Sequence, residues 1–283
     1  MNRTAADALD GARTEKVLAR LGFDTAPPVT LVGLAAVYDA WCRNVPFDNV
    51  RKLIHVRHDD PALLPGDDPA DFFDAWLSHG CGGTCWAGNG ALHALLTSLG
   101  FSAQRVVATM MVAPNISPNH GSVVVNIEGG DFIVDASILH IEPLPMRAHE
   151  ECRIAHAAWG VTGIWVDGQF RIRWRNFLTS DWMDCGIDTV GAESTEFASF
   201  HELTRVWSPF NFSLSVNSIR GNSRIGAALG KVMTFDERGE HAARPVELPE
   251  RRRFLVEEVG MSEQIVRELP DDIPITPPPG ARS

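Results

Sequence analysis

The spacing of hydrophobic residues changes once along the chain, near Phe101, and this change restricts the fold more than any other feature. Before it, apolar residues recur every three to four positions, as in amphipathic helices, for example over residues 31–44 and 85–101. After it, β-branched and aromatic runs are interrupted at residues 128–131 and 167–168 by Gly-Gly and Asp-Gly turns, which are strong hairpin signals. The sequence therefore predicts a helical part followed by an antiparallel β part.

The C-terminal third of the chain mixes both patterns. Residues 181–202 are polar and predict a partly helical connection. Residues 210–219 and 227–237 have the composition of strands. Residues 255–269 predict one final amphipathic helix, which is followed by a Pro-rich tail.

These differences divide the chain into three predicted lobes of an α+β fold. We expect a helical bundle over residues 1–100, a small antiparallel β-barrel over residues 101–190, and an α/β lid over residues 191–283. Several short hairpins in succession are the reason for predicting a barrel.

Charge and hydropathy exclude two classes of partner. The 283 residues carry a net charge of −11, from 25 Lys and Arg against 36 Asp and Glu, so the chain lacks the basic balance that nucleic acids and anionic membranes select. No apolar run reaches the roughly 18 residues needed to span a bilayer, and the N-terminal segment has no signal-peptide pattern. We expect a cytoplasmic protein without a nucleic-acid or membrane partner.

Cysteine and histidine spacing gives little support for a metal site. The five cysteines are odd in number and scattered, which favours reduced thiols over a disulfide framework. His79, Cys81 and Cys85 lie close together in the sequence, as do His55 and His58. Structural zinc sites use four ligands in recognisable pairs, and no second pair lies nearby at suitable spacing. We predict no metal.

Cys85 is the strongest candidate for a reactive group. It follows Gly82-Gly83-Thr84 and opens an apolar helical run. A helix start has unpaired backbone N–H groups and the positive end of the helix dipole, so a thiol there ionises more readily. The same N–H groups can stabilise an oxyanion. The other interpretation is a small buried core residue, which is what free cysteines commonly are.

His120 and Asp135 are the candidate partners of a cysteine nucleophile. His120 lies where a loop enters one predicted strand, and Asp135 ends the next strand. A hairpin about Gly129-Gly130 brings these far ends together, although His120 is nine residues before Gly129 and Asp135 only five after Gly130. We therefore expect a bulge or an extended loop. An acid beside a histidine fixes its tautomer and stabilises its charged form. Taken singly, the two residues also fit a loop histidine and a strand-end cap.

Six segments occur in an order that is more specific than any one of them. They are Val45-Pro46-Phe47-Asp48-Asn49, Gly82-Gly83-Thr84-Cys85 with Asn89 and residues 99–101, Gln104-Arg105-Val106, His120 with residues 132–135, residues 142–146, and Ser208-Pro209-Phe210-Asn211-Phe212. The set spans nearly the whole chain and resembles the arylamine N-acetyltransferase family, of which the chain is identified as a divergent member.

This resemblance implies a fold, a reaction and a set of residues. The fold is helical bundle, β-barrel and α/β lid, with a Cys-His-Asp arrangement like that of cysteine proteases. Cys85 takes an acyl group, in the family an acetyl group, from a CoA thioester and passes it to a small amine, while His120 moves the proton and Asp135 orients it. Acetyl-CoA or another acyl-CoA is then a co-substrate, with no permanently bound cofactor. The residues implied to bind substrate are Phe47, Trp86 and Phe210.

The sequence departs from the family pattern at three places. Cys81 stands where the family has an arginine, Ala87 where it has an acid, and Ala136-Ser137-Ile138 where it has Gly-Phe-Gly. Other acyl donors and acceptors therefore stay open. So do an amide synthase, a cysteine hydrolase or transglutaminase-like enzyme with the same three residues, and a non-catalytic relative.

Overall fold

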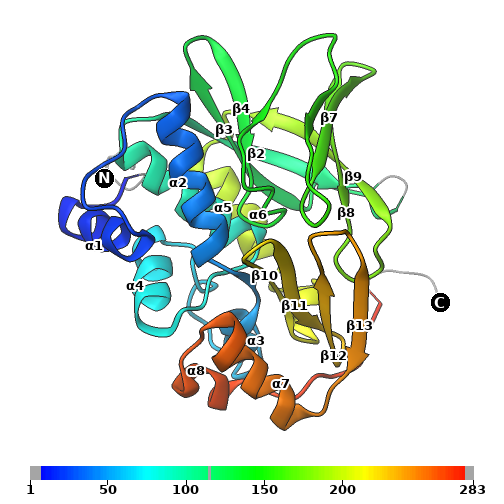
Figure 1. The fold of residues 1–283 in the computed structure, drawn as a ribbon. Coiled ribbons are helices and arrows are strands. Elements are labelled where there is room, and N and C mark those ends of the chain that lie inside the picture. The colour runs from blue at the N-terminus through cyan, green and yellow to red at the C-terminus, as the bar shows by residue number, and fades with distance from the viewer. Residues whose placement is uncertain (1–7, 114–115, 278–283) are drawn as a thin grey trace.

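The computed structural model describes residues 8–113 and 116–277, and it has the predicted α+β fold (Figure 1). Helices occupy the first part of the chain, an eight-stranded antiparallel sheet the middle, and a five-stranded sheet with further helices the last part. The early helices are α1 (Gly11–Leu21), α2 (Leu31–Asn44), α3 (Val50–Arg57), α4 (Pro69–His79) and α5 (Cys85–Ser98).

Side-chain caps fix where several of these helices begin. Thr30 accepts a hydrogen bond from the Gly33 N–H and caps α2. Asp10 caps α1 by accepting from the Arg13 N–H. Asp68 caps α4. Helix α3 was not predicted, because its charged residues obscure the apolar spacing.

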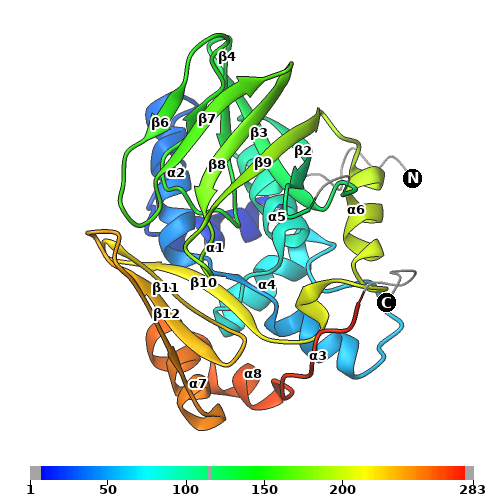
Figure 2. The same ribbon diagram turned by 90° about the vertical axis from the view of Figure 1, so that its right-hand side faces the viewer.

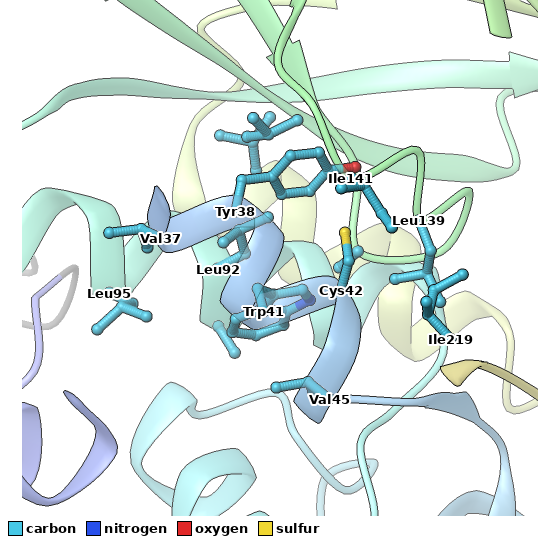
Figure 3. Packing of buried hydrophobic residues seen from close by; sticks show 14 of the residues in the cluster. Val37, Tyr38, Trp41, Cys42, Val45, Leu92, Leu95, Leu139, Ile141 and Ile219 are labelled. Atoms are coloured by element: carbon cyan, nitrogen blue, oxygen red, sulfur yellow. The ribbon is translucent and has the colours of Figure 1, made fainter. Parts of the chain in front are cut away.

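The helices α2, α4 and α5 pack on one another through buried hydrophobic side chains. Trp41 of α2 stacks on Phe72 of α4, with ring centroids 5.9 Å apart. Figure 3 shows α2 lying between Leu95 of α5 and Leu139 of the loop that follows strand β4. This packing buries α5 over most of its length, so Cys85, its first residue, is held by a rigid element.

The middle of the chain forms one antiparallel sheet that curls into a nearly closed barrel, which confirms the predicted barrel. Its strands lie in the order β5-β4-β3-β2-β9-β8-β7-β6. They are β2 (Ser102–Met110), β3 (His120–Ile127), β4 (Gly130–Val134), β5 (Leu144–Pro145), β6 (Cys152–Ile154), β7 (Val161–Val166), β8 (Gln169–Arg175) and β9 (Trp182–Val190).

The predicted hairpin turns are confirmed by backbone geometry. Glu128 and Gly129 have φ values of 53° and 80°, and Asp167 and Gly168 have 51° and 80°. Positive φ at both central residues is the signature of the type I′ turn that joins twisted strands. The strands flanking each turn pair directly on either side of it.

The prediction for residues 181–202 was wrong in its first half. These residues begin with β9, a full barrel strand, and only then form the helix α6 (Ser194–Leu203). Acidic side chains hide the strand in the sequence: Asp184 pairs with Arg173 of β8, and Asp188 accepts a hydrogen bond from Thr109 of β2. These are cross-strand contacts that polarity alone does not reveal.

The last part of the chain forms a second antiparallel sheet, in the order β1-β10-β11-β12-β13. Its edge strand β1 (Phe47–Asp48) comes from the helical part and pairs Phe47 with Asn217. The other strands are β10 (Ser215–Arg220), β11 (Ser223–Ala228), β12 (Lys231–Phe235) and β13 (His241–Pro245). The predicted strand at 210 begins only at Ser215, because the short 3-10 helix η2 (Pro209–Asn211) precedes it.

Helices cover one face of this second sheet (Figures 1 and 2). They are α3, α7 (Leu248–Phe254), the π-turn η3 (Leu255–Val259) and α8 (Glu263–Glu268). The prediction of one helix over residues 255–269 was wrong. Gly260, with φ of 89°, ends the first segment, and Ser262 caps the next by accepting from Ile265 N–H. The boundaries predicted for the three lobes stay predictions.

Over the described residues, no helix combines the length and the apolar composition that crossing a bilayer requires.

Tyr38 joins the helical part to the barrel. Its hydroxyl donates to the Asp135 carbonyl oxygen at 2.9 Å and accepts from the Asp135 N–H at 3.0 Å. Tyr38→Phe leaves both buried backbone groups without this partner, so we expect the free energy of unfolding in denaturant to fall by about 1–3 kcal/mol. The matched change Trp182→Phe, at a side chain 58% exposed, is expected to shift it by less than about 0.5 kcal/mol. Equal effects of the two changes contradict this role of Tyr38.

Candidate active site

His120 and Asp135 meet in the interior. His120 Nε2 lies 2.8 Å from Asp135 Oδ2, and the two residues are 2% and 0% exposed. Strands β3 and β4 pair in regular register from Ile127 opposite Gly130 to Val123 opposite Val134. The same register sets Asp135 opposite Ser122, with His120 one diagonal step along the same face. The expected bulge was therefore wrong: the diagonal reach of the side chains makes up the difference in length.

The Asp135 carboxylate is held in its charged form. Burial raises its pKa, but the charge and hydrogen bond of His120 and the Ile138 N–H outweigh burial and lower the pKa well below its usual range. Its Oδ1 accepts from the N–H groups of Ser137 at 2.8 Å and Ile138 at 2.9 Å. Burial also lowers the pKa of His120, but the Asp135 carboxylate and a hydrogen bond with Cys85 raise it above its ordinary value. Both shifts favour a charged pair, an aspartate beside a protonated imidazole, over two neutral groups.

Cys85 lies beside this pair, at the first position of α5, and is 7% exposed. Its Sγ lies 3.9 Å from the carbonyl oxygen of Asn119, the residue before His120. The structure therefore pairs His120 with Asp135 and sets the Cys85 sulfur against the backbone of the residue before His120. A thiol, an imidazole and a carboxylate in this order can form and resolve a covalent thioester.

Asn89, one turn further along α5, fixes the spacing within the site. Its amide donates to the carbonyl oxygens of Cys85 at 3.1 Å and Gly121 at 2.6 Å, and its Oδ1 accepts from Ala136 N–H at 2.9 Å. It thus ties the nucleophile helix to the residues next to His120 and Asp135. In the sequence, Asn89 stands out only as part of a motif, because its partners Gly121 and Ala136 are distant along the chain.

The Gly82-Gly83 turn is held by the segment that contains β1. Asp48 Oδ2 accepts from Gly82 N–H at 2.6 Å, and Asp48 N–H donates to the Gly83 carbonyl at 3.1 Å. A Cβ at position 82 would lie 1.9 Å from the Pro46 carbonyl oxygen, so only glycine allows this approach. Burial raises the pKa of Asp48 to about 6, although the N–H groups of Gly82 and Val50 oppose this.

Two departures from the family pattern have a structural explanation here. Cys81, where the family has an arginine, is fully buried and supplies no charge to Asp48. Ala87, where the family has an acid, is 2% exposed. A Cβ at Gly66 or Gly83 would already lie 2.7 or 2.9 Å from the Ala87 Cβ. The surroundings of Ala87 leave no space for a glutamate.

The three aromatic residues expected to bind substrate do not lie together. Phe47 and Phe210 contact edge to face, with ring centroids 5.4 Å apart. Trp86 instead stacks on Phe200 of α6 at 5.2 Å and meets Phe197 edge to face. Figure 2 shows α6 standing beside α5, where this aromatic group forms. Trp86 also lines a cavity of about 200 Å³ between α5 and α6.

Lys52 is a residue near the site that the sequence analysis missed. It lies in α3, is 5% exposed, and its Nζ donates to Thr204 Oγ1 at 2.8 Å. Burial lowers its pKa to about 7, while the charges of Cys85 and Glu202 favour the protonated form and Arg205 opposes it. The sequence gives no signal for it, because Lys52 is one of three Lys and Arg residues in α3 and its acceptor lies far away along the chain.

Within residues 8–113 and 116–277, no group of three or more His, Cys, Asp or Glu side chains has the arrangement to hold a metal ion.

The comparisons with known proteins agree with the sequence resemblance. Residues 30–167 match the N-acetyltransferase family model. A sequence comparison with curated proteins gives no match.

Three solved structures illustrate the likeness in fold. The arylamine N-acetyltransferase of Mycobacterium abscessus superposes with a TM-score of 0.76 at 18% identity, covering 90% of this chain and 92% of that chain. The enzyme of Salmonella typhimurium gives 0.75 at 15% identity, covering 92% and 98%. The enzyme of Mycobacterium marinum in complex with CoA gives 0.75 at 15% identity, covering 89% and 96%. The resemblance to this family is confirmed, and the family match supports acetyl transfer in general.

Asp48 gives a testable prediction about the nucleophile turn. Asp48→Ala removes the acceptor of the buried N–H groups of Gly82 and Val50, each worth about 1–3 kcal/mol when left unsatisfied. We expect lower stability in denaturant and slower alkylation of Cys85 by iodoacetamide, because the turn is no longer held. Asp39→Ala, which breaks an exposed pair with Arg43 on α2, is the control and should change neither. An alkylation rate unaffected by Asp48→Ala contradicts the prediction.

Proposed function

We propose that this chain, which has the fold of the arylamine N-acetyltransferases, is an acyltransferase that carries an acyl group on Cys85 from a CoA thioester to an amine nitrogen. The observation that carries the proposal is the buried His120–Asp135 pair, 2.8 Å apart, beside a cysteine at the start of α5. Burying an ion pair next to a thiol costs free energy of desolvation, unless the two charges stabilise each other or take part in a reaction.

The first half-reaction is acylation of the thiol. The Cys85 thiolate attacks the thioester carbonyl, a C–S bond to Cys85 forms, and the C–S bond to CoA breaks. The imidazolium of His120 supplies the proton to the departing CoA thiolate, and Asp135 keeps the ring oriented. The first N–H groups of α5 have no acceptor within the helix and can stabilise the transient oxyanion.

The second half-reaction returns the acyl group to a nitrogen. The amine attacks the Cys85 thioester, His120 takes the amine proton, and the Cys85 thiolate leaves. The edge-to-face pair of Phe47 and Phe210 offers an apolar surface for the acceptor, and the low exposure of Cys85 limits competition from water. The CoA-bound relative from Mycobacterium marinum supports a CoA thioester as donor, with acetyl-CoA as the first donor to test.

Mass spectrometry of the intact protein after incubation with acetyl-CoA, and then with other acyl-CoA thioesters, tests the proposal. We expect one acyl adduct, located on the Cys85 peptide, that an aromatic amine or a hydrazine discharges. Cys85→Ala abolishes the adduct, whereas Cys42→Ala, at a core thiol whose pKa burial raises well above its ordinary value, leaves it unchanged.

Two results contradict the proposal. No adduct with any acyl-CoA excludes the covalent route. If water removes the acyl group from Cys85 as fast as amines do, the protein is a hydrolase that uses the same three residues.

Asp135→Asn tests the role of the carboxylate. The amide has the same shape but cannot stabilise the imidazolium, so we expect the single-turnover rate of Cys85 acylation to fall by about 10³-fold or more. His140→Asn, at a buried histidine that faces Tyr38 rather than Cys85, is the matched control and should keep the rate within about tenfold. An acylation rate for Asp135→Asn equal to the wild-type rate excludes Asp135 from the mechanism.

A further inference from the structure

Three neighbouring elements hold Lys52 close to the nucleophile. It lies in the first turn of α3, directly after β1, whose Asp48 binds the Gly82-Gly83 turn that leads to Cys85. Its Nζ reaches Thr204 at the end of α6, the helix that packs beside α5. Lys52 thus lies between the nucleophile turn and α6.

Lys52 is buried and forms no ion pair with any residue of the part of the chain that the structure describes. Thr204 Oγ1 is the hydrogen-bond acceptor of its Nζ, and a lysine ammonium has three donors. Glu202, whose charge acts on Lys52, pairs with Arg205 and accepts from the Leu64 N–H. Burying an ammonium that is not paired costs several kcal/mol, so a site of this kind gains when an anion enters it.

A thiolate on Cys85 can serve as this anion, because a negative charge there favours the protonated form of Lys52. Acylation of Cys85 turns the thiolate into a neutral thioester and removes that charge. A carboxylate carried by the acyl group or by the incoming amine can then take its place beside the ammonium.

We propose that Lys52 gives the Cys85 site a preference for reactants that carry a carboxylate within reach of the sulfur, on the acyl group or on the acceptor amine. Naming the reactants as acyl donor and acceptor rests on the function proposed above. The recognition of a negative charge next to Cys85 is independent of that function.

A pair of alkylating reagents measures this recognition without any acyl transfer. Iodoacetate and iodoacetamide both react by attack of the Cys85 thiolate on carbon, with loss of iodide, and they differ in charge. At a given pH both meet the same fraction of thiolate, so the ratio of their rate constants at Cys85 reports the attraction of the carboxylate. Peptide mass spectrometry assigns the alkylation to Cys85 rather than to the other buried thiols.

We expect the iodoacetate to iodoacetamide ratio at about pH 6 to be about tenfold higher in the wild type than in Lys52→Met. Lys52→Arg keeps the charge and should keep most of the ratio. Lys16→Met, at an exposed lysine of α1, is the control and should not change it. A ratio equal within about twofold in the wild type and Lys52→Met overturns the proposal.

The pH dependence of the wild type decides the question even if Lys52→Met does not fold. The charged groups that act on Lys52 are Cys85 of α5, Glu202 of α6 and Arg205 after it. Because burial lowers the pKa of Lys52 to about 7, its positive charge is present below that pH and is lost above it. The reagent ratio should therefore fall as pH rises through about 7, and a flat ratio overturns the proposal.

Two substrate pairs then assign the source of the carboxylate. Succinyl-CoA is compared with acetyl-CoA for acylation of Cys85, and 4-aminobenzoate with aniline for discharge of the acetyl-enzyme. If Lys52→Met lowers the rate only for the charged member of one pair, that member is the reactant whose carboxylate Lys52 recognises. A high reagent ratio without acylation by any thioester contradicts the proposed function alone. Acylation with a ratio that Lys52→Met leaves unchanged contradicts the role of Lys52 alone.

Discussion

Asp135 has no solvent exposure, and its side chain and backbone together join the parts of the chain that build the site. The carboxylate holds His120 of β3 and the N–H groups of Ser137 and Ile138, while the backbone holds the Tyr38 hydroxyl of α2. A carboxylate buried in this way is stable only if its charge is matched and its lone pairs are used. The barrel can therefore bury Asp135 only if His120 supplies the matching positive charge.

The candidate residues of the site could be named from the sequence, and the geometry that relates them could not. A cysteine after two glycines, a histidine entering a strand and an acid ending the next are local features, so they can be read without a structure. The contact between His120 and Asp135 depends on a diagonal step in the β3–β4 register, which residue counting about Gly129-Gly130 reads as a mismatch. The order of the six sequence segments indicated the pairing of His120 with Asp135, whereas counting residues from the turn did not.

Sequence-based predictions failed where contacts between distant residues, rather than the local pattern of polar and apolar residues, decide the structure. The polar face of β9 looks like a loop until Arg173 and Thr109 of the neighbouring strands are placed against it. Trp86 follows the nucleophile in sequence, but the helix turns it toward α6 and away from Phe47. Lys52 finds its hydrogen-bond acceptor in Thr204, 152 residues later in the chain. None of these three outcomes follows from the composition of the segment concerned.

The departures at Cys81 and Ala87 are physically coupled. An arginine at the first position and an acid at the second contribute opposite charges near the nucleophile turn. With the arginine replaced by a thiol, a buried acid at position 87 would lack compensation, and the packing of Gly83 against Ala87 shows that its space is gone. Losing both keeps the local charge balanced and leaves the nucleophile, histidine and aspartate unaltered.

Asp48 and Lys52 are two buried ionisable groups near this turn, and neither forms a salt bridge with another of the described residues. Burial raises the pKa of Asp48 to about 6 and lowers that of Lys52 to about 7, so burial moves both groups toward their neutral forms. Asp48 is already engaged by the N–H groups of Gly82 and Val50. Lys52 has a single neutral hydroxyl, Thr204, as its acceptor among the described residues. Of the two, the lysine is the one that can donate hydrogen bonds to an anionic group that a reactant brings, so the charge preference of this site depends on the cation rather than on the acid.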